Sequence, residues 1–220
     1  MRRDIGRLRQ LRESYMDMKL IVRGVSLALV ALALTFVTVF SLSFYLDSRS
    51  DQQVAGDGGR VTIGGDFDLI DTTGAAVSED LVRNTPYAIF FGFTFCPEIC
   101  PTTLAELSGW INQMGPAADE MKFIFVTVDP ERDTPDILAD YVGAFSNRII
   151  GLTGTSEQVD AAVKTYRVYA RRVELDNGDY TMDHSAAILL FDQNGELTGT
   201  INRMDNTDDA LRKLKSTAGV

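Results

Sequence analysis

The sequence contains very little histidine and cysteine. Its 220 residues include one histidine and two cysteines. Two cysteines are too few for a disulfide-rich scaffold. One histidine excludes a His-rich zinc site and any catalytic centre that needs two imidazoles. Positive charge is also scarce, because 21 Lys and Arg residues stand against 31 Asp and Glu, giving a formal net charge of −10. This balance gives no overall electrostatic support to nucleic-acid binding.

Charge is distributed unevenly along the chain. Residues 1–23 hold 7 basic and 3 acidic side chains, whereas residues 24–220 hold 14 basic and 28 acidic ones. From Gly24 to Leu46 no residue is charged. About 20 apolar residues in a helix cross the hydrocarbon core of a bilayer, whereas the apolar part of a signal peptide runs to roughly 7–15. Residues 24–46 are therefore predicted to be an uncleaved transmembrane anchor.

The flanks of this anchor predict its orientation. Basic residues precede it and Asp47 follows it, so by the positive-inside rule residues 1–23 are cytoplasmic and the rest of the chain is exported. Acidic residues near the N-terminus argue against a mitochondrial transit peptide. We therefore expect a single-pass protein of the bacterial inner membrane with its C-terminal domain in the periplasm. Residues 47–59 are polar and Gly-rich, which predicts a flexible tether to a domain over 60–220.

Short apolar runs alternate with helical patterns in that domain. An N-terminal hairpin is predicted over 60–70 with its turn at 71–74, and later strands over Tyr87–Phe95, Lys122–Val128, Ile149–Leu152, Ala186–Phe191 and Glu196–Asn202. Helices are predicted over Thr102–Met114, Thr134–Phe145, from Thr155 or Ser156 to about Tyr166, and over Thr207–Ser216. Buried strands that alternate with helices predict an α/β domain, a central mixed sheet flanked by helices. The thioredoxin-like fold has this order.

The two cysteines, Cys96 and Cys100, lie between a predicted strand and a predicted helix. Backbone N–H groups at the start of a helix favour a thiolate, which is both the nucleophile of disulfide exchange and a soft metal ligand. Three roles are open from the spacing alone: a structural disulfide, a redox dithiol, or a metal site with at least one more ligand. The structural disulfide is the least favoured, because so short a loop contributes little stability.

The single histidine, His184, precedes the last buried strand. In a thioredoxin-like sheet the start of this strand lies beside the active-site loop, so we expect His184 to face Cys96 and Cys100. Two thiolates and one imidazole are too few for a closed zinc site but suit Cu(I), and also Cu(II) with an added ligand. Asp183 is a candidate for orienting the imidazole ring. Four methionines are weaker candidate ligands, for which packing roles are favoured: Met114, Met121, Met182 and Met204.

Five blocks of sequence, in order, resemble the Sco/SenC family. They are Phe-Thr-Phe-Cys-Pro-Glu-Ile-Cys-Pro-Thr at 93–102, Thr-Val-Asp-Pro-Glu-Arg-Asp-Thr at 127–134, Leu-Thr-Gly-Thr at 152–155, Tyr-Arg-Val-Tyr at 166–169 and Asp-His-Ser at 183–185. The family consists of membrane-anchored, thioredoxin-like copper proteins that help to build the binuclear copper site of cytochrome c oxidase.

This resemblance implies a site and a function. It implies that Cys96, Cys100 and His184 bind copper, as Cu(I) or Cu(II), and that residues 129–133 form a loop near the site. The implied function is that of a copper chaperone rather than an enzyme, with the copper-site subunit of the oxidase and other copper carriers as partners. The alternative is a thiol–disulfide oxidoreductase that keeps acceptor cysteines reduced, in which Cys96 and Cys100 are the redox pair.

Overall fold

A computed structural model describes residues 62–220 of the chain, together with Thr35 and Thr38. The predicted cytoplasmic segment, the predicted tether and, apart from these two threonines, the predicted anchor lie outside the described residues. Within the described part, no helix has the length and apolar character needed to span a membrane. Residues 62–220 belong to one compact unit.

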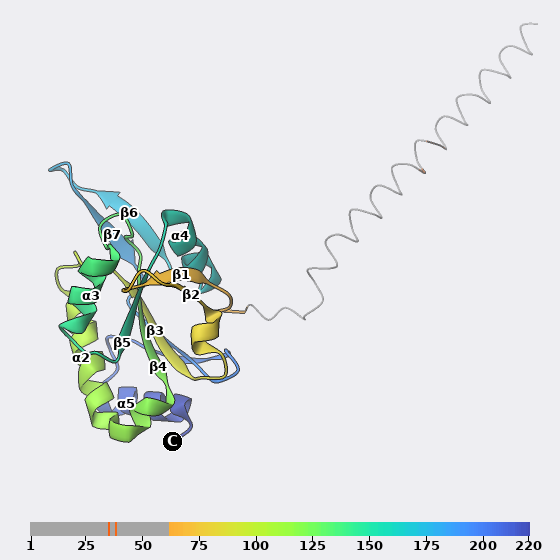
Figure 1. Ribbon diagram of the computed structural model, residues 1–220, viewed down its shortest axis with the longest axis vertical. Helices are drawn as coiled ribbons and strands as arrows, with labels where there is room; N and C mark the ends of the chain where they lie inside the picture. The colour runs from red at the N-terminus through yellow and green to blue at the C-terminus, as the bar shows by residue number, and fades with distance from the viewer. Residues whose placement is uncertain (1–34, 36–37, 39–61) are drawn as a thin grey trace, which may run out of the picture. The chain divides into compact units, whose positions relative to one another are not determined.

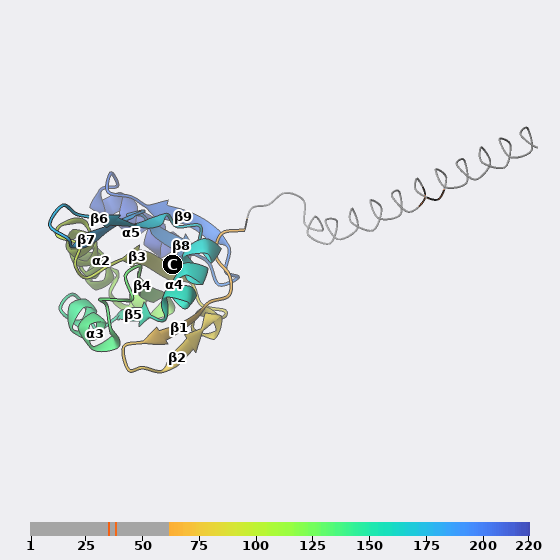
Figure 2. The same ribbon diagram turned by 90° about the horizontal axis from the view of Figure 1, so that it is seen from above.

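A seven-stranded mixed sheet lies at the centre of this unit (Figures 1 and 2). In spatial order its strands are β2 (Ala76–Ser78), β1 (Asp68–Asp71), β5 (Ile149–Thr153), β4 (Lys122–Thr127), β3 (Tyr87–Gly92), β8 (Ile188–Phe191) and β9 (Leu197–Ile201). Strands β3, β4 and β5 are parallel to one another, and the outer strands are antiparallel to their neighbours. The parallel strands are almost continuous apolar runs, as expected where helices cover both faces of a sheet.

Four α-helices of the described chain surround the sheet: α2 (Ile99–Met114), α3 (Pro135–Gly143), α4 (Ser156–Thr165) and α5 (Thr207–Ala218). Helices α2 and α3 lie on one side of the central strands and α4 lies on the other, as Figures 1 and 2 both show. Helix α5 packs against α2 and β9. Two short 3-10 helices, η1 (Glu79–Val82) and η2 (Gly115–Glu120), complete the connections.

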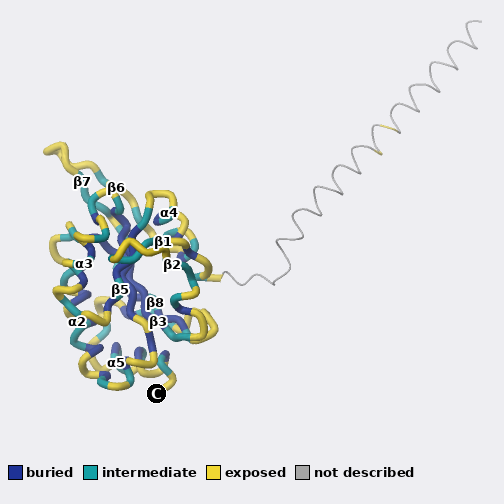
Figure 3. Tube along the Cα trace, viewed as in Figure 1, coloured by how far each residue is buried: buried dark blue, intermediate teal, exposed yellow. Residues whose placement is uncertain are grey.

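Local sequence signals fix where several helices begin. The Thr155 side chain accepts a hydrogen bond from the backbone of Gln158, and the Gln158 side chain bonds back to the backbone of Thr155, so α4 starts with a complete capping box. Pro135 occupies the first position of α3, where its missing N–H costs nothing. The apolar residues of these helices then pack on the sheet, and Figure 3 shows buried residues concentrated in the central strands.

The predicted α/β class and the order of its main elements are confirmed, but several boundaries differ. The first strand begins at Asp68 rather than at residue 60, β3 ends at Gly92 rather than Phe95, and α3 ends at Gly143 rather than Phe145. Helix α2 begins at Ile99, three residues before its predicted start, and so includes Cys100 and Pro101 in its first turn. Proline fits this turn because N–H groups there have no acceptor within the helix. The helix predicted from Thr102 left both Cys100 and Pro101 outside it.

A further difference is a two-stranded hairpin that the sequence did not predict. Strands β6 (Ala170–Glu174) and β7 (Tyr180–His184) pair with each other and form a sheet of their own. The hairpin projects beyond the end of the central sheet (Figure 1), and residues 174–179 at its tip are exposed (Figure 3). No residue of either strand is fully buried, so the hairpin lacks the continuous apolar run that identified the strands of the central sheet.

Candidate metal centre

The two cysteines and the histidine meet at one end of the sheet. Cys96 lies in the turn after β3, Cys100 lies in the first turn of α2, and His184 is the last residue of β7. One ligand atom from each of the three lies within 4.8 Å of the others. The predicted proximity of His184 to both cysteines is thus what the structure shows. The site lies beyond the carboxyl ends of parallel strands β3 and β4, the usual position of ligand sites in open α/β sheets.

The two thiols differ in burial. Cys100 has an exposed fraction of 0%, whereas Cys96 is partly exposed. Room for the Cys100 thiol depends on Gly92, because a Cβ atom there would lie 2.9 Å from Sγ of Cys100 and 2.8 Å from the Phe125 ring. Such contacts are closer than packed atoms tolerate, so glycine is required where β3 passes the thiol.

Burial also decides the protonation of Cys100. Desolvation raises the pKa of its thiol well above the usual range, which differs from the expectation that the start of a helix favours a thiolate. The backbone N–H of Cys100 points instead at Cys96, whose Sγ atom accepts it at 3.4 Å. The helix start therefore interacts with Cys96, whereas desolvation favours the protonated form of the Cys100 thiol.

The imidazole of His184 is held in one orientation. Its Nδ1 atom lies 2.9 Å from the carbonyl oxygen of Ser185, and because a carbonyl only accepts, Nδ1 carries the proton. The Nε2 atom then carries the lone pair, which accepts a hydrogen bond from the Cys100 thiol with Sγ at 3.4 Å. Desolvation lowers the pKa of His184, which favours the neutral ring that metals bind.

Asp183 does not orient this ring, and the prediction that it would is wrong. The ring is bonded to the carbonyl of Ser185 and contacts the edges of two aromatic rings, Phe93 with centroids 5.7 Å apart and Phe90 at 6.2 Å. Asp183 is exposed. Side chains alternate between the two faces of a strand, so Asp183 faces away from the residue that follows it in β7.

The candidate methionines lie in different environments. Met114 ends α2, a helix of 16 residues whose first turn holds Cys100, and is buried in the core. Met121 is buried immediately before β4, at the opposite end of that strand from the site, and Met204 is 96% exposed. These three have packing or surface positions. Met182 lies two residues before His184 on the same face of β7 and packs partly against the core.

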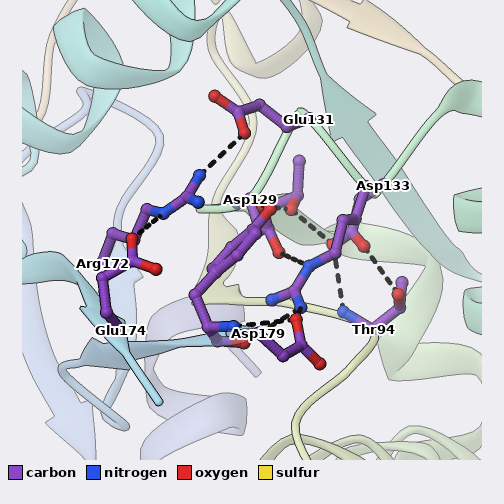
Figure 4. A network of polar contacts seen from close by, with 10 residues as sticks. Thr94, Asp129, Glu131, Asp133, Arg172, Glu174 and Asp179 are labelled. Carbon is purple, nitrogen blue, oxygen red and sulfur yellow. Dashed lines mark hydrogen bonds and ion pairs between the residues drawn. The ribbon is translucent and has the colours of Figure 1, made fainter. Parts of the chain in front are cut away.

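A buried carboxylate ties the cysteine segment to the loop of residues 129–133, which follows β4. The carboxylate of Asp133 accepts hydrogen bonds from the Thr94 hydroxyl at 2.6 Å, the Thr94 backbone N–H at 3.0 Å and the Thr127 hydroxyl at 2.6 Å (Figure 4). Burial raises the pKa of Asp133. Thr94 is two residues before Cys96, so its hydrogen bonds to Asp133 fix the turn that carries the partly exposed thiol of Cys96.

Some residues of the site were not found from the sequence. Thr94 lies in the block around the cysteines and Gly92 immediately precedes it, but nothing in this stretch indicates a close approach or a buried partner. Ser185 acts through its backbone carbonyl, which no side-chain pattern reveals.

The unequal burial predicts unequal reactivity of the thiols. During a short anaerobic pulse of iodoacetamide, Cys96 should be alkylated more than about tenfold faster than Cys100, because labelling of Cys100 requires a local opening of the fold. Fragment ions in mass spectrometry locate the label. In concentrated guanidinium chloride the two rates should become similar. Equal rates in the native protein would contradict the burial of Cys100.

The fold and the site together define a class of protein: a thioredoxin-like α/β domain that places two thiols and one imidazole within reach of a single metal ion. The family model described as SCO1/SenC matches residues 55–219. The chain therefore belongs to the SCO1/SenC family, and the resemblance seen in the sequence is confirmed.

Curated relatives come from mitochondria and bacteria. The mitochondrial protein SCO2 of Saccharomyces cerevisiae is 37% identical over 161 residues, which cover 71% of this chain and 53% of that protein. The chain thus spans about half the length of the yeast relative. The SCO2-like protein of Rickettsia felis is 38% identical over 138 residues, covering 62% of this chain and 67% of that protein.

Several of the solved structures of similar proteins are copper-bound. The copper-bound ScoI of Bradyrhizobium japonicum is 41% identical, with a TM-score of 0.66, covering 71% of this chain and 99% of that chain. Copper-bound Sco1 of yeast is 34% identical, with a TM-score of 0.66, covering 72% of this chain and 89% of that chain. These neighbours confirm the thioredoxin-like fold predicted for the domain.

Proposed function

We propose that this protein binds copper between Cys96, Cys100 and His184 and delivers it during the assembly of cytochrome c oxidase. The observation that carries the proposal is the approach of the three donor atoms to within 4.8 Å of one another. The copper-bound structures of Bradyrhizobium japonicum ScoI and yeast Sco1 support copper as the metal. The acceptor we propose is the copper-site subunit of the oxidase, and other copper carriers are the proposed donors.

The donor set fits copper better than zinc. Zinc in structural sites takes four ligands, and among the described residues no further His, Cys, Asp or Glu joins this cluster. Cu(I) accepts soft sulfur at low coordination number, and Cu(II) accepts sulfur and imidazole together with an added ligand. Binding to both thiols displaces their protons, while the neutral imidazole of His184 offers Nε2 without losing one.

A redox role for Cys96 and Cys100 is the second candidate, and one observation favours it. Both cysteines are free, and their Sγ atoms lie within 4.8 Å, so a small movement brings them to the roughly 2.05 Å of a disulfide. What supports the copper role instead is the imidazole lone pair directed at Cys100. Both roles need reduced thiols, so they can also operate in one protein.

The two functions are separated by anaerobic titration of the reduced, full-length protein. The copper role predicts binding of one Cu(I) or one Cu(II) per chain and, with Cu(II), a sulfur-to-copper charge-transfer band. Oxidation by diamide, in which the two thiols give up two electrons and two protons to form a disulfide, should abolish this binding. A reduced protein that binds no copper but catalyses reduction of a disulfide substrate would establish the redox role instead.

We propose that residues 24–46 anchor the protein in the bacterial inner membrane with residues 47–220 in the periplasm. The basic flank of the uncharged stretch supports this orientation. A reporter that is active only in the periplasm, fused after residue 60, should be active, and the matched cytoplasmic reporter should be inactive. The opposite pattern would refute the orientation.

A further inference from the structure

We infer that Asp129, Arg132 and Tyr180 form a clamp that holds the β6–β7 hairpin in place and thereby positions the His184 imidazole on the two thiols. The inference rests on the proposed copper site, because it assigns positioning residues to one of its ligands. Tyr180 begins β7 and His184 ends it, so the clamp acts on the same strand that carries the imidazole.

Within the clamp, Asp129 and Arg132 contact three parts of Tyr180: its hydroxyl, its backbone carbonyl and its ring. The Tyr180 hydroxyl donates to Oδ1 of Asp129 at 2.8 Å. The Arg132 guanidinium donates to the Tyr180 carbonyl oxygen at 3.0 Å and lies 3.7 Å from the centroid of the Tyr180 ring. Arg132 also forms an ion pair with Oδ2 of Asp129. Because hydroxyl, ring and backbone are all engaged, the start of β7 has little freedom to shift or rotate.

The hairpin depends on such side-chain contacts, because β6 and β7 form no ladder with the central sheet in the described chain. The ion pair of the clamp is buried, with side chains of Asp129 and Arg132 that are 3% and 17% exposed. The remaining ion pairs of the hairpin each have an exposed partner. Arg132 pairs with Asp179, whose side chain is 61% exposed, and Arg172 pairs with Glu131 and Glu174, all three of which are at least 45% exposed. Exposed pairs contribute little to stability, so the clamp is the stronger attachment.

The same loop also contacts the cysteine segment. Asp133 binds Thr94 through two hydrogen bonds, and the Arg132 guanidinium lies 4.7 Å from the centroid of the Phe95 ring. Figure 4 shows Asp129 and Asp133 on this loop, with dashed contacts that link Asp133 to Thr94 of the cysteine segment and others that lead to the hairpin. Residues 129–133 therefore fix the distance between the segment that carries the thiols and the hairpin that carries the imidazole.

Asp129 acts here as a positioning residue rather than as a metal ligand. Its Oδ1 atom accepts from Tyr180 and its Oδ2 atom is paired with Arg132, so both oxygens are engaged. Loss of the clamp should free the imidazole while the thiols remain in place. A residue that served only general stability would instead affect every element of the fold.

Tyr180→Phe tests the clamp, because it removes only the hydroxyl bond to Asp129. In the copper-free protein, hydrogen exchange of the β6–β7 amides should become about tenfold faster, the effect of losing one hydrogen bond to a charged group, while exchange in α2 stays unchanged. With Cu(II), the charge-transfer band and the nitrogen coupling in electron paramagnetic resonance should shift towards those of His184→Ala. Binding of Cu(I) should stay within about threefold of wild type, because both thiols remain.

Tyr169→Phe is the matched control, because Tyr169 precedes the same hairpin and is 50% exposed. It should leave hydrogen exchange and copper spectra as in the wild type. Wild-type exchange and spectra in Tyr180→Phe would overturn the inference. So would faster exchange throughout β3, β4 and α2 together with loss of Cu(I), which would show a general role in stability. If the wild type bound no copper, the proposed function would fail, whereas the exchange measurement would still test the clamp.

Discussion

Replacing Cys100 by serine should abolish tight binding of Cu(I). The change removes one of two soft sulfur ligands and leaves a hydroxyl that stays protonated at neutral pH. Changes in the surroundings of a ligand typically reduce metal affinity by 10–100-fold, so loss of a ligand itself should cost more than about 100-fold. Competition against a chromophoric Cu(I) chelator under anaerobic conditions measures the effect, and Cys96→Ser should behave in the same way.

Met204→Ser provides the control for both cysteine variants, because it removes a sulfur atom from a side chain that is 96% exposed. Its affinity for Cu(I) should equal that of the wild type. Circular dichroism should show that all three variants are folded. Tight Cu(I) binding by folded Cys100→Ser would exclude a two-thiolate site and would leave the redox role of the cysteines as the better explanation.

Replacing His184 by alanine should separate the two oxidation states of copper. Two thiolates hold Cu(I) in near-linear geometry, so Cu(I) affinity should partly remain. Cu(II) prefers mixed nitrogen and sulfur ligation and would lose the only imidazole of the chain. Its charge-transfer band should therefore collapse or shift strongly. The measurement pairs visible spectra of the Cu(II) form with chelator competition for Cu(I).

The fold of His184→Ala should be nearly unchanged, because the ring lies at the end of the sheet and contacts Phe90 and Phe93 only through tilted or edge-on arrangements. Its free energy of unfolding should fall by no more than about 2 kcal/mol. A Cu(II) spectrum identical to that of the wild type would show that His184 is not a ligand.

The central sheet was predictable from the sequence because burial leaves a strong pattern. All six residues of β3 are buried, and such runs cannot be confused with loops. The β6–β7 hairpin lacks that pattern. In β6, Arg171 and Arg172 are exposed and no residue is fully buried, so no apolar face identified it as a strand.

The proximity of Cys96, Cys100 and His184 was predictable from the sequence, but the contacts around them were not. The approach of His184 to the cysteines followed from the order of elements in a thioredoxin-like fold. The error at Asp183 followed from the missed strand, since only strand alternation shows that neighbouring residues face opposite sides. The clamp joins Asp129 to Tyr180 across 51 positions, a separation that no local pattern spans.

The unequal burial of the two sulfurs leaves the proposed copper site open towards Cys96 and His184, which are both partly exposed, whereas Cys100 is buried. A copper ion held there, as we propose, would meet solvent beside these two residues rather than beside Cys100. An acceptor thiol arriving from solvent would therefore displace Cys96 first and Cys100 last. Copper would remain bonded to at least one sulfur atom throughout the exchange, so the ion would pass between proteins without being released into the surrounding water.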